Sequence, residues 1–109
     1  MRRFTKPSQV LAYARKCVSY GHARGAFARG RSGVMVGARQ PSAVCWCVSG
    51  GIERSTSDSL LASDAHAYLM RVAGCMTRKE LHQWSDRHST VHVLAVMRIA
   101  QRMAEQDGR

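Results

Sequence analysis

A chain of 109 residues is long enough for one hydrophobic core, and an apolar content of 45% excludes bulk disorder. No run approaches the ~18 consecutive apolar residues of a transmembrane helix, and the basic N-terminus lacks the apolar stretch of a signal peptide. We therefore expect one domain over residues 1–109, in the cytoplasm, with its four cysteines as reduced thiols.

The charge of the chain is high and unevenly distributed. Lys and Arg number 17 against 7 Asp and Glu, which gives a net charge of +10, and no acidic residue precedes Glu53. This asymmetry favours a polyanionic partner for the first half, although charge can also serve solubility alone. The residues predicted to contact the partner are Arg2, Arg3, Lys6, Arg24, Arg29, Arg31 and Arg39.

The chain begins with a short basic arm over residues 1–5, followed by an amphipathic helix. Pro7 suits a first helical turn, where a missing N–H costs little. Apolar residues then recur at helical spacing from Val10 to Val18, and Gly21 ends the pattern. We expect one face of this helix to be buried.

Residues 21–40 are rich in glycine and have no helical period. The apolar segments 26–28 and 34–36 flank Arg-Gly-Arg-Ser-Gly at 29–33, which predicts a short β-hairpin with arginines at an exposed tip. The glycines do not match a phosphate-binding loop.

Residues 41–54 are predicted to form a buried central helix. Apolar residues lie on two sides of it, with Cys47 on one side and Trp46 on the other. Ser42 would cap the helix, and the pair Gly50–Gly51 would allow a neighbouring backbone to approach closely.

Three more helices complete the predicted fold. One covers residues 61–72 and ends at Gly74; a short one starts at a capping box of Thr77 and Glu80; the last follows a turn over 85–89. The fold class is therefore mainly α: a single compact domain of four to five helices around a buried central helix, with a short β-hairpin insertion.

Three short motifs resemble a known pattern. The segments GAFAR, WCVSGG and WSD are similar to G-A-x-A-R, W-C-x-x-G-A and W-N-D of a family of small uncharacterised bacterial and phage proteins, over about residues 8–104. Gly51 and Ser85 depart from that pattern, where the family has Ala and Asn. The resemblance implies a compact helical domain and brings no activity with it. The matching positions are Arg29, Trp46, Cys47, Gly50, Trp84, Asp86 and Thr90.

The cysteines and histidines could form a thiol active site or a zinc site, but their spacing favours neither. Cys47 and Asp86, with a histidine, are the residue types of a thiol enzyme, but no signature ties them together. A zinc site would draw on Cys45, Cys47, Cys75, His66, His82, His88 and His92. No C-x-x-C pair is present, and a predicted cap separates His88 from His92, so we expect no metal and no cofactor. Trp84 and Asp86 are interpreted as structural.

These patterns together favour binding over catalysis. We predict a non-enzymatic protein whose basic N-terminal half contacts the backbone of nucleic acid, or a nucleoprotein, with weak sequence selectivity. Base stacking is not expected, because only Phe27 lies among the arginines. The alternative is a small phage-type anti-defence inhibitor, similar to an anti-CRISPR, that binds an acidic protein surface. A cysteine-dependent or metal-dependent enzyme is the lesser alternative.

Overall fold

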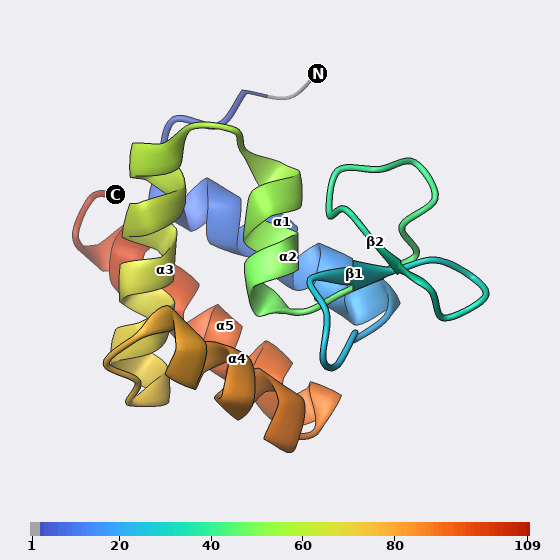
Figure 1. The fold of residues 1–109 in the computed structure, drawn as a ribbon. Helices are drawn as coiled ribbons and strands as arrows, with labels where there is room; N and C mark the ends of the chain where they lie inside the picture. The colour runs from blue at the N-terminus through green and yellow to red at the C-terminus, as the bar shows by residue number, and fades with distance from the viewer. Residues whose placement is uncertain (1–2) are drawn as a thin grey trace.

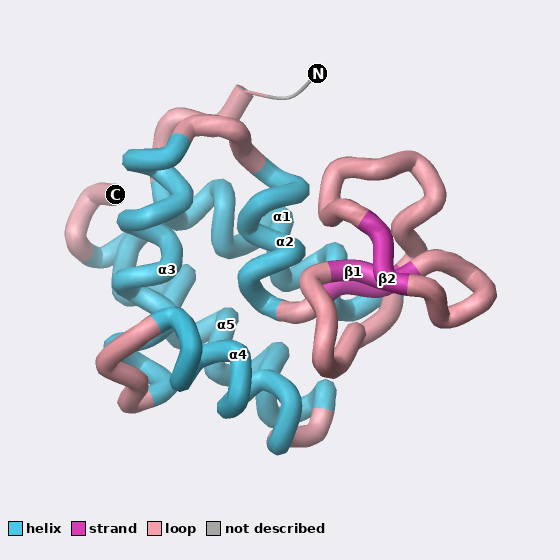
Figure 2. Tube along the Cα trace, in the orientation of Figure 1, coloured by secondary structure: helices cyan, strands magenta, loops and turns pink. Residues whose placement is uncertain are grey.

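The computed structural model describes residues 3–109, and it has five helices and a small sheet (Figure 1). In chain order the elements are α1 (Pro7–Tyr20), β1 (Ala28–Arg29), β2 (Met35–Val36), β3 (Cys45–Trp46), α2 (Val48–Ser55), α3 (Ser59–Ala73), α4 (Arg78–Arg87) and α5 (Thr90–Gln106). The sheet lies at one end of the molecule and α3 at the other (Figures 1 and 2). The prediction of a mainly α fold with a short hairpin insertion is confirmed.

Helix α1 contacts α2, α3, α5 and β3, so it occupies the middle of the fold. Its apolar face is fully buried at Val10, Leu11, Ala14 and Val18. The regular spacing of these residues explains why this helix could be assigned from sequence, with Pro7 in its first turn and Gly21 after its end.

The predicted helix over residues 41–54 is wrong in its first half. Helix α2 begins only at Val48, and Cys45 and Trp46 form strand β3. Strand β3 pairs with β1, which supplies hydrogen bonds that a helix would otherwise provide. Cys47, and not Ser42, caps α2 and accepts a hydrogen bond from Gly50 N at 3.3 Å.

The sheet has the antiparallel order β2-β1-β3. The expected hairpin is present as β1 and β2, with Ala28 opposite Val36, and β3 is a third strand that the sequence did not predict. Trp46 remains buried, with 7% of its surface exposed, and its indole N–H donates to the Ala38 carbonyl at 3.0 Å.

The two glycines of α2 permit close backbone contacts, as expected. A Cβ at Gly50 would overlap the carbonyl oxygen of Phe27, and one at Gly51 would lie 2.9 Å from the Ala14 carbonyl oxygen. The hairpin segment and α1 therefore approach α2 more closely than any side chain would allow.

The connection before α5 is shorter than predicted. Helix α4 continues to Arg87, and Ser85 lies within it and is fully buried, so the turn expected over 85–89 is wrong. Burial of Ser85 is possible because its hydroxyl is hydrogen-bonded to His22 Nε2 at 3.1 Å. Ser89 caps α5 and accepts a hydrogen bond from His92 N.

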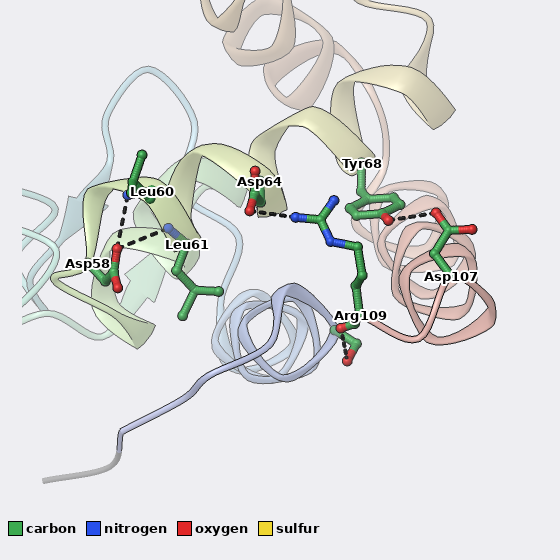
Figure 3. A network of polar contacts seen from close by, with 8 residues as sticks. Asp58, Leu60, Leu61, Asp64, Tyr68, Asp107 and Arg109 are labelled. Carbon is green, nitrogen blue, oxygen red and sulfur yellow. Dashed lines mark hydrogen bonds and ion pairs between the residues drawn. The ribbon is translucent and has the colours of Figure 1, made fainter.

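Polar contacts cap α3 and join it to the C-terminal residues (Figure 3). Asp58 caps α3 by accepting hydrogen bonds from Leu60 N and Leu61 N. Further along α3, the Arg109 guanidinium pairs with Asp64 at 2.6 Å and lies over the ring of Tyr68. Figure 3 also shows the Tyr68 hydroxyl donating to Asp107. The main chain of Arg109 accepts a hydrogen bond from the Ser8 hydroxyl at 2.9 Å, which joins the C-terminal residues to α1.

Candidate functional site

The three motif segments meet where the hairpin insertion packs against α2 and α4. Gly25 N donates to the Asp86 carboxylate at 3.0 Å, and Cys47 N donates to the Phe27 carbonyl at 3.1 Å. Asp86 therefore has a structural contact, as interpreted from sequence, although its partner is in the insertion and not in the turn before α5. The motifs define one junction in space.

A cavity of about 410 Å³ lies at this junction, and we call it the junction cavity. Its lining consists of Gly25, Ala26, Phe27, Met35, Val36, Cys47, His82 and Asp86. Cys47, His82 and Asp86 all line it. The sequence analysis named these residue types as those of a thiol enzyme, but it could not show that they lie close together. His82 and Asp86 are one turn apart on α4.

A chain of hydrogen bonds fixes the protonation pattern behind the cavity wall. Nδ1 of His66 must donate to the Ala62 carbonyl, 2.8 Å away, because a carbonyl oxygen only accepts. Burial lowers the pKa of His66 to about 4, so its ring is neutral at pH 7 and Nε2 is an acceptor. The Ser49 hydroxyl, 3.0 Å from this atom, therefore donates to it.

The same hydroxyl lies 3.0 Å from Nε2 of His82. Since the Ser49 proton is already directed to His66, Ser49 Oγ must accept a hydrogen bond from His82 Nε2–H. In its neutral form His82 therefore carries the proton on Nε2 and has a lone pair on Nδ1, to which no described residue hydrogen-bonds. The ring is also held edge-on to Phe27, with 5.1 Å between centroids.

The Cys47 thiol is not arranged as an activated nucleophile. Burial raises its pKa, although the N–H of Gly50 donates to Sγ and acts in the opposite direction. Within residues 3–109 no hydrogen bond joins the thiol to His82. The described part of the chain also has no group of three His, Cys, Asp or Glu side chains able to hold a metal ion.

A second cavity, of about 630 Å³, lies between residue 4, α1, β3 and α2, and we call it the aromatic cavity. Its lining is Phe4, Tyr13, Lys16, Cys17, Tyr20, Trp46 and Arg54. It combines four aromatic rings with two cations and includes no acidic side chain. Arg54 lies over the Trp46 ring, 5.4 Å from its centroid, and Tyr20 is 71% exposed.

Sequence reasoning missed the aromatic cavity. One signal was available, because Tyr13, Lys16 and Tyr20 are spaced by three and four residues and so lie on one face of α1. Trp46 could not be added from the sequence, because it comes from a strand that forms only by pairing with β1.

The sequence predicted that Arg29 extends from an exposed hairpin tip, and the structure shows that it does not. It belongs to β1, and its guanidinium donates to the carbonyl oxygens of Arg24 and Gly33, at 3.0 and 2.9 Å. These bonds join the two loops that flank the strand. Arg29 is therefore a structural residue of the insertion.

The other predicted contact residues have different surroundings. Arg24 donates to the His88 carbonyl and Arg39 to the Thr56 carbonyl, each at 3.0 Å. Arg31 is exposed at the turn of the hairpin, and Arg3 and Lys6 are exposed before α1. Arg2 lies outside the described residues.

Two further clusters were not predicted. Arg15, Arg98 and Arg102 line a shallow cavity of about 490 Å³ at the contact of α1 and α5. The rings of His88 and His92 stack with centroids 4.6 Å apart, although Ser89 caps α5 between them, which corrects the expectation that the cap keeps them apart.

None of the helices within residues 3–109 is both long and apolar enough to span a bilayer. Fold and cavities together define a small helical domain with a β-hairpin inserted between its first two helices and a ligand-sized cavity beside the insertion. A family model described as a family of unknown function, DUF6197, matches residues 3–103, so the chain belongs to that family. Neither the curated proteins nor the solved structures include a match to the chain.

Proposed function

We propose that the protein binds single-stranded nucleic acid, with the aromatic cavity as its contact for bases. The observation that carries this proposal is the composition of the cavity: the partly or largely exposed rings of Phe4, Tyr13 and Tyr20 lie beside two cations, without a carboxylate. Proteins that bind single strands use aromatic side chains to stack bases and cations to neutralise the backbone. The volume of about 630 Å³ is within the range of small-molecule sites and accommodates a base.

The charge distribution supports the same proposal. No acidic residue precedes Glu53, and the lining residues Phe4 to Trp46 all come from that part of the chain. Lys16, an exposed cation of the lining, would contact the phosphates, and the exposed Lys6 follows the lining residue Phe4 by two positions. Such binding is weakly selective for sequence and weakens as salt rises. We place this activity in the cytoplasm.

Fluorescence anisotropy with labelled single-stranded DNA and RNA, at two salt concentrations, tests the proposal. Tyr20→Ala removes an exposed ring from the cavity and should weaken binding about tenfold, because one base stack contributes about 1–3 kcal/mol. Lys16→Gln should weaken binding and reduce its salt dependence. Arg98→Gln is the matched control: it removes the same charge from α5, away from the aromatic cavity, and should have a smaller effect.

Two results would contradict the proposal. Equal effects of Lys16→Gln and Arg98→Gln, with none for Tyr20→Ala, would indicate attraction by net charge alone. Absence of binding by the native protein at low salt would exclude nucleic acid as the partner. The alternative is then an anti-defence inhibitor that binds an acidic protein, and a pull-down with one tight partner would support it.

A further inference from the structure

We propose that the junction cavity is a second binding site, for a small and mostly apolar molecule that carries an ammonium or amidinium group. This site shares no lining residue with the aromatic cavity and does not depend on nucleic-acid binding. Its ligand class follows from the walls of the cavity, from its hydrogen-bonding groups and from the sign of its charge.

The walls are mainly apolar and partly open to solvent. Phe27 is 43% exposed and Met35 is 65% exposed, and both line the cavity with Ala26 and Val36. Large apolar side chains gathered around a hollow favour the apolar body of a ligand. A volume of about 410 Å³ admits a molecule of the size of a substituted benzene ring.

The strong polar groups of the cavity are acceptors. Ser49 holds the Nε2 proton of His82, so Nδ1 of this ring presents a lone pair. Asp86 uses Oδ1 to accept from Gly25 N and retains a second carboxylate oxygen. The Cys47 thiol is neutral and only a weak donor. A complementary ligand must therefore supply the N–H groups.

The charge of the lining indicates the sign of the charge on the ligand. The chain carries 17 Lys and Arg residues, yet none of them lines the junction cavity, whereas Asp86 does. The aromatic cavity and the cavity at α1 and α5 include two and three cations, respectively. In a protein of net charge +10, a cavity in which Asp86 is the charged residue of the lining favours a cationic ligand over an anionic one. The ring of Phe27 adds a face on which a cation can lie.

Benzamidine is a suitable probe, because it joins an apolar ring to a cationic amidinium whose N–H groups match the acceptors of the lining. Titration of ¹⁵N-labelled protein, followed by NMR, should give saturable shifts of the amides of Gly25 and Phe27. Benzamide has the same shape without the charge and should bind more weakly. Benzoate reverses the charge and should leave these amides unshifted. Absence of saturable shifts with benzamidine would overturn the proposal, and so would equal binding of benzoate.

Variants separate this site from general attraction to a carboxylate. Asp86→Asn keeps an oxygen that can accept from Gly25 N, so the junction is retained, but the charge is lost. Benzamidine binding should weaken about tenfold, as expected for the loss of a charge-assisted hydrogen bond. Glu105→Gln, the matched control on α5, makes the same change in net charge and should have no effect.

Unchanged affinity in folded Asp86→Asn would overturn the proposal. If that variant does not fold, His82→Phe tests the proposal instead, because it keeps a ring beside Phe27 and removes the Nδ1 acceptor. Its affinity for benzamidine should fall severalfold, and native affinity would overturn the assignment of His82 as an acceptor for the ligand.

Discussion

The helical body and the hairpin insertion are held together by different forces. In the body, α1, α3 and α5 bury a continuous apolar cluster that includes Leu11, Leu69 and Met97. A smaller apolar cluster joins the insertion to α1; Trp46 is its largest member, and Cys17 of α1 belongs to it. Many of the insertion's other contacts are polar, such as the hydrogen bond of Arg29 to Gly33 and that of Gly25 to Asp86.

The comparison indicates that the body provides stability and that the insertion provides the geometry of the cavities. Burial of apolar area is strong and non-directional, so it stabilises the body. Hydrogen bonds at an exposed surface contribute little net stability but fix geometry, so they shape the loops around the cavities. Regions with few buried apolar contacts open at lower free energy, and we expect the insertion to open before the body does.

The largest expected effect comes from removing the apolar anchor of the insertion. Trp46→Ala should reduce the free energy of unfolding by about 3–5 kcal/mol, because it leaves a cavity. It also leaves the Ala38 carbonyl without the indole donor. Chemical denaturation measures the loss. A change below about 1 kcal/mol would mean that the insertion contributes no apolar stabilisation, and the comparison would then have to be abandoned.

A second test addresses the helical body through pH. The buried His66 ring has a pKa of about 4 in the folded protein, below the value of 6.5 for a solvent-exposed histidine. The unfolded chain therefore binds the proton more readily, and stability should fall as the pH is lowered from about 6.5 to 4. The loss from this group approaches about 3 kcal/mol below that range, at about 1.4 kcal/mol per pH unit.

Denaturation curves at several pH values in native protein and in His66→Gln measure this contribution. The variant should lose less stability between pH 7 and 4 than the native protein loses. His22, whose pKa is also lowered by burial, should leave a smaller acid dependence of the same sign in both proteins. Identical pH profiles would show that His66 is not neutral in the folded body.

The smallest expected effect comes from the polar contacts of the insertion. Arg29→Gln removes donors to two carbonyl oxygens and should cost about 1 kcal/mol, whereas Arg31→Gln, at an exposed position, should stay within about 0.5 kcal/mol. Hydrogen exchange of the Gly30 amide, which donates to the Val34 carbonyl at 2.9 Å, is a local measure. Exchange should be faster in Arg29→Gln alone. Equal exchange in the two variants would remove the structural role of Arg29.

The same division explains what could be predicted from the sequence. Helix α1 and the helix ended by Gly74 were predictable, because a buried helical face repeats in the sequence itself. The segment before Val48 was not, because a short apolar run has no period, and its strand exists only through pairing with β1. Sequence analysis named Cys47 and Asp86, but their junction depends on contacts between residues far apart in the chain.

The aromatic cavity illustrates the same limit. Its rings come from residue 4, from α1 and from β3, so no window of the sequence contains them together. The surroundings of Arg29 could not be predicted for a related reason. A guanidinium in a glycine-rich segment can bind an external phosphate or a nearby carbonyl oxygen, and Arg29 binds carbonyl oxygens within its own insertion.

The close contact at Gly50 gives this position diagnostic value among related chains. Because the Phe27 carbonyl occupies the place of a side chain, a relative with any other residue there must carry its hairpin farther from the second helix. Phe27 also borders the junction cavity, so such a relative would have a cavity of different shape. The identity of a single residue thus sorts family members by pocket geometry before any of their structures is determined.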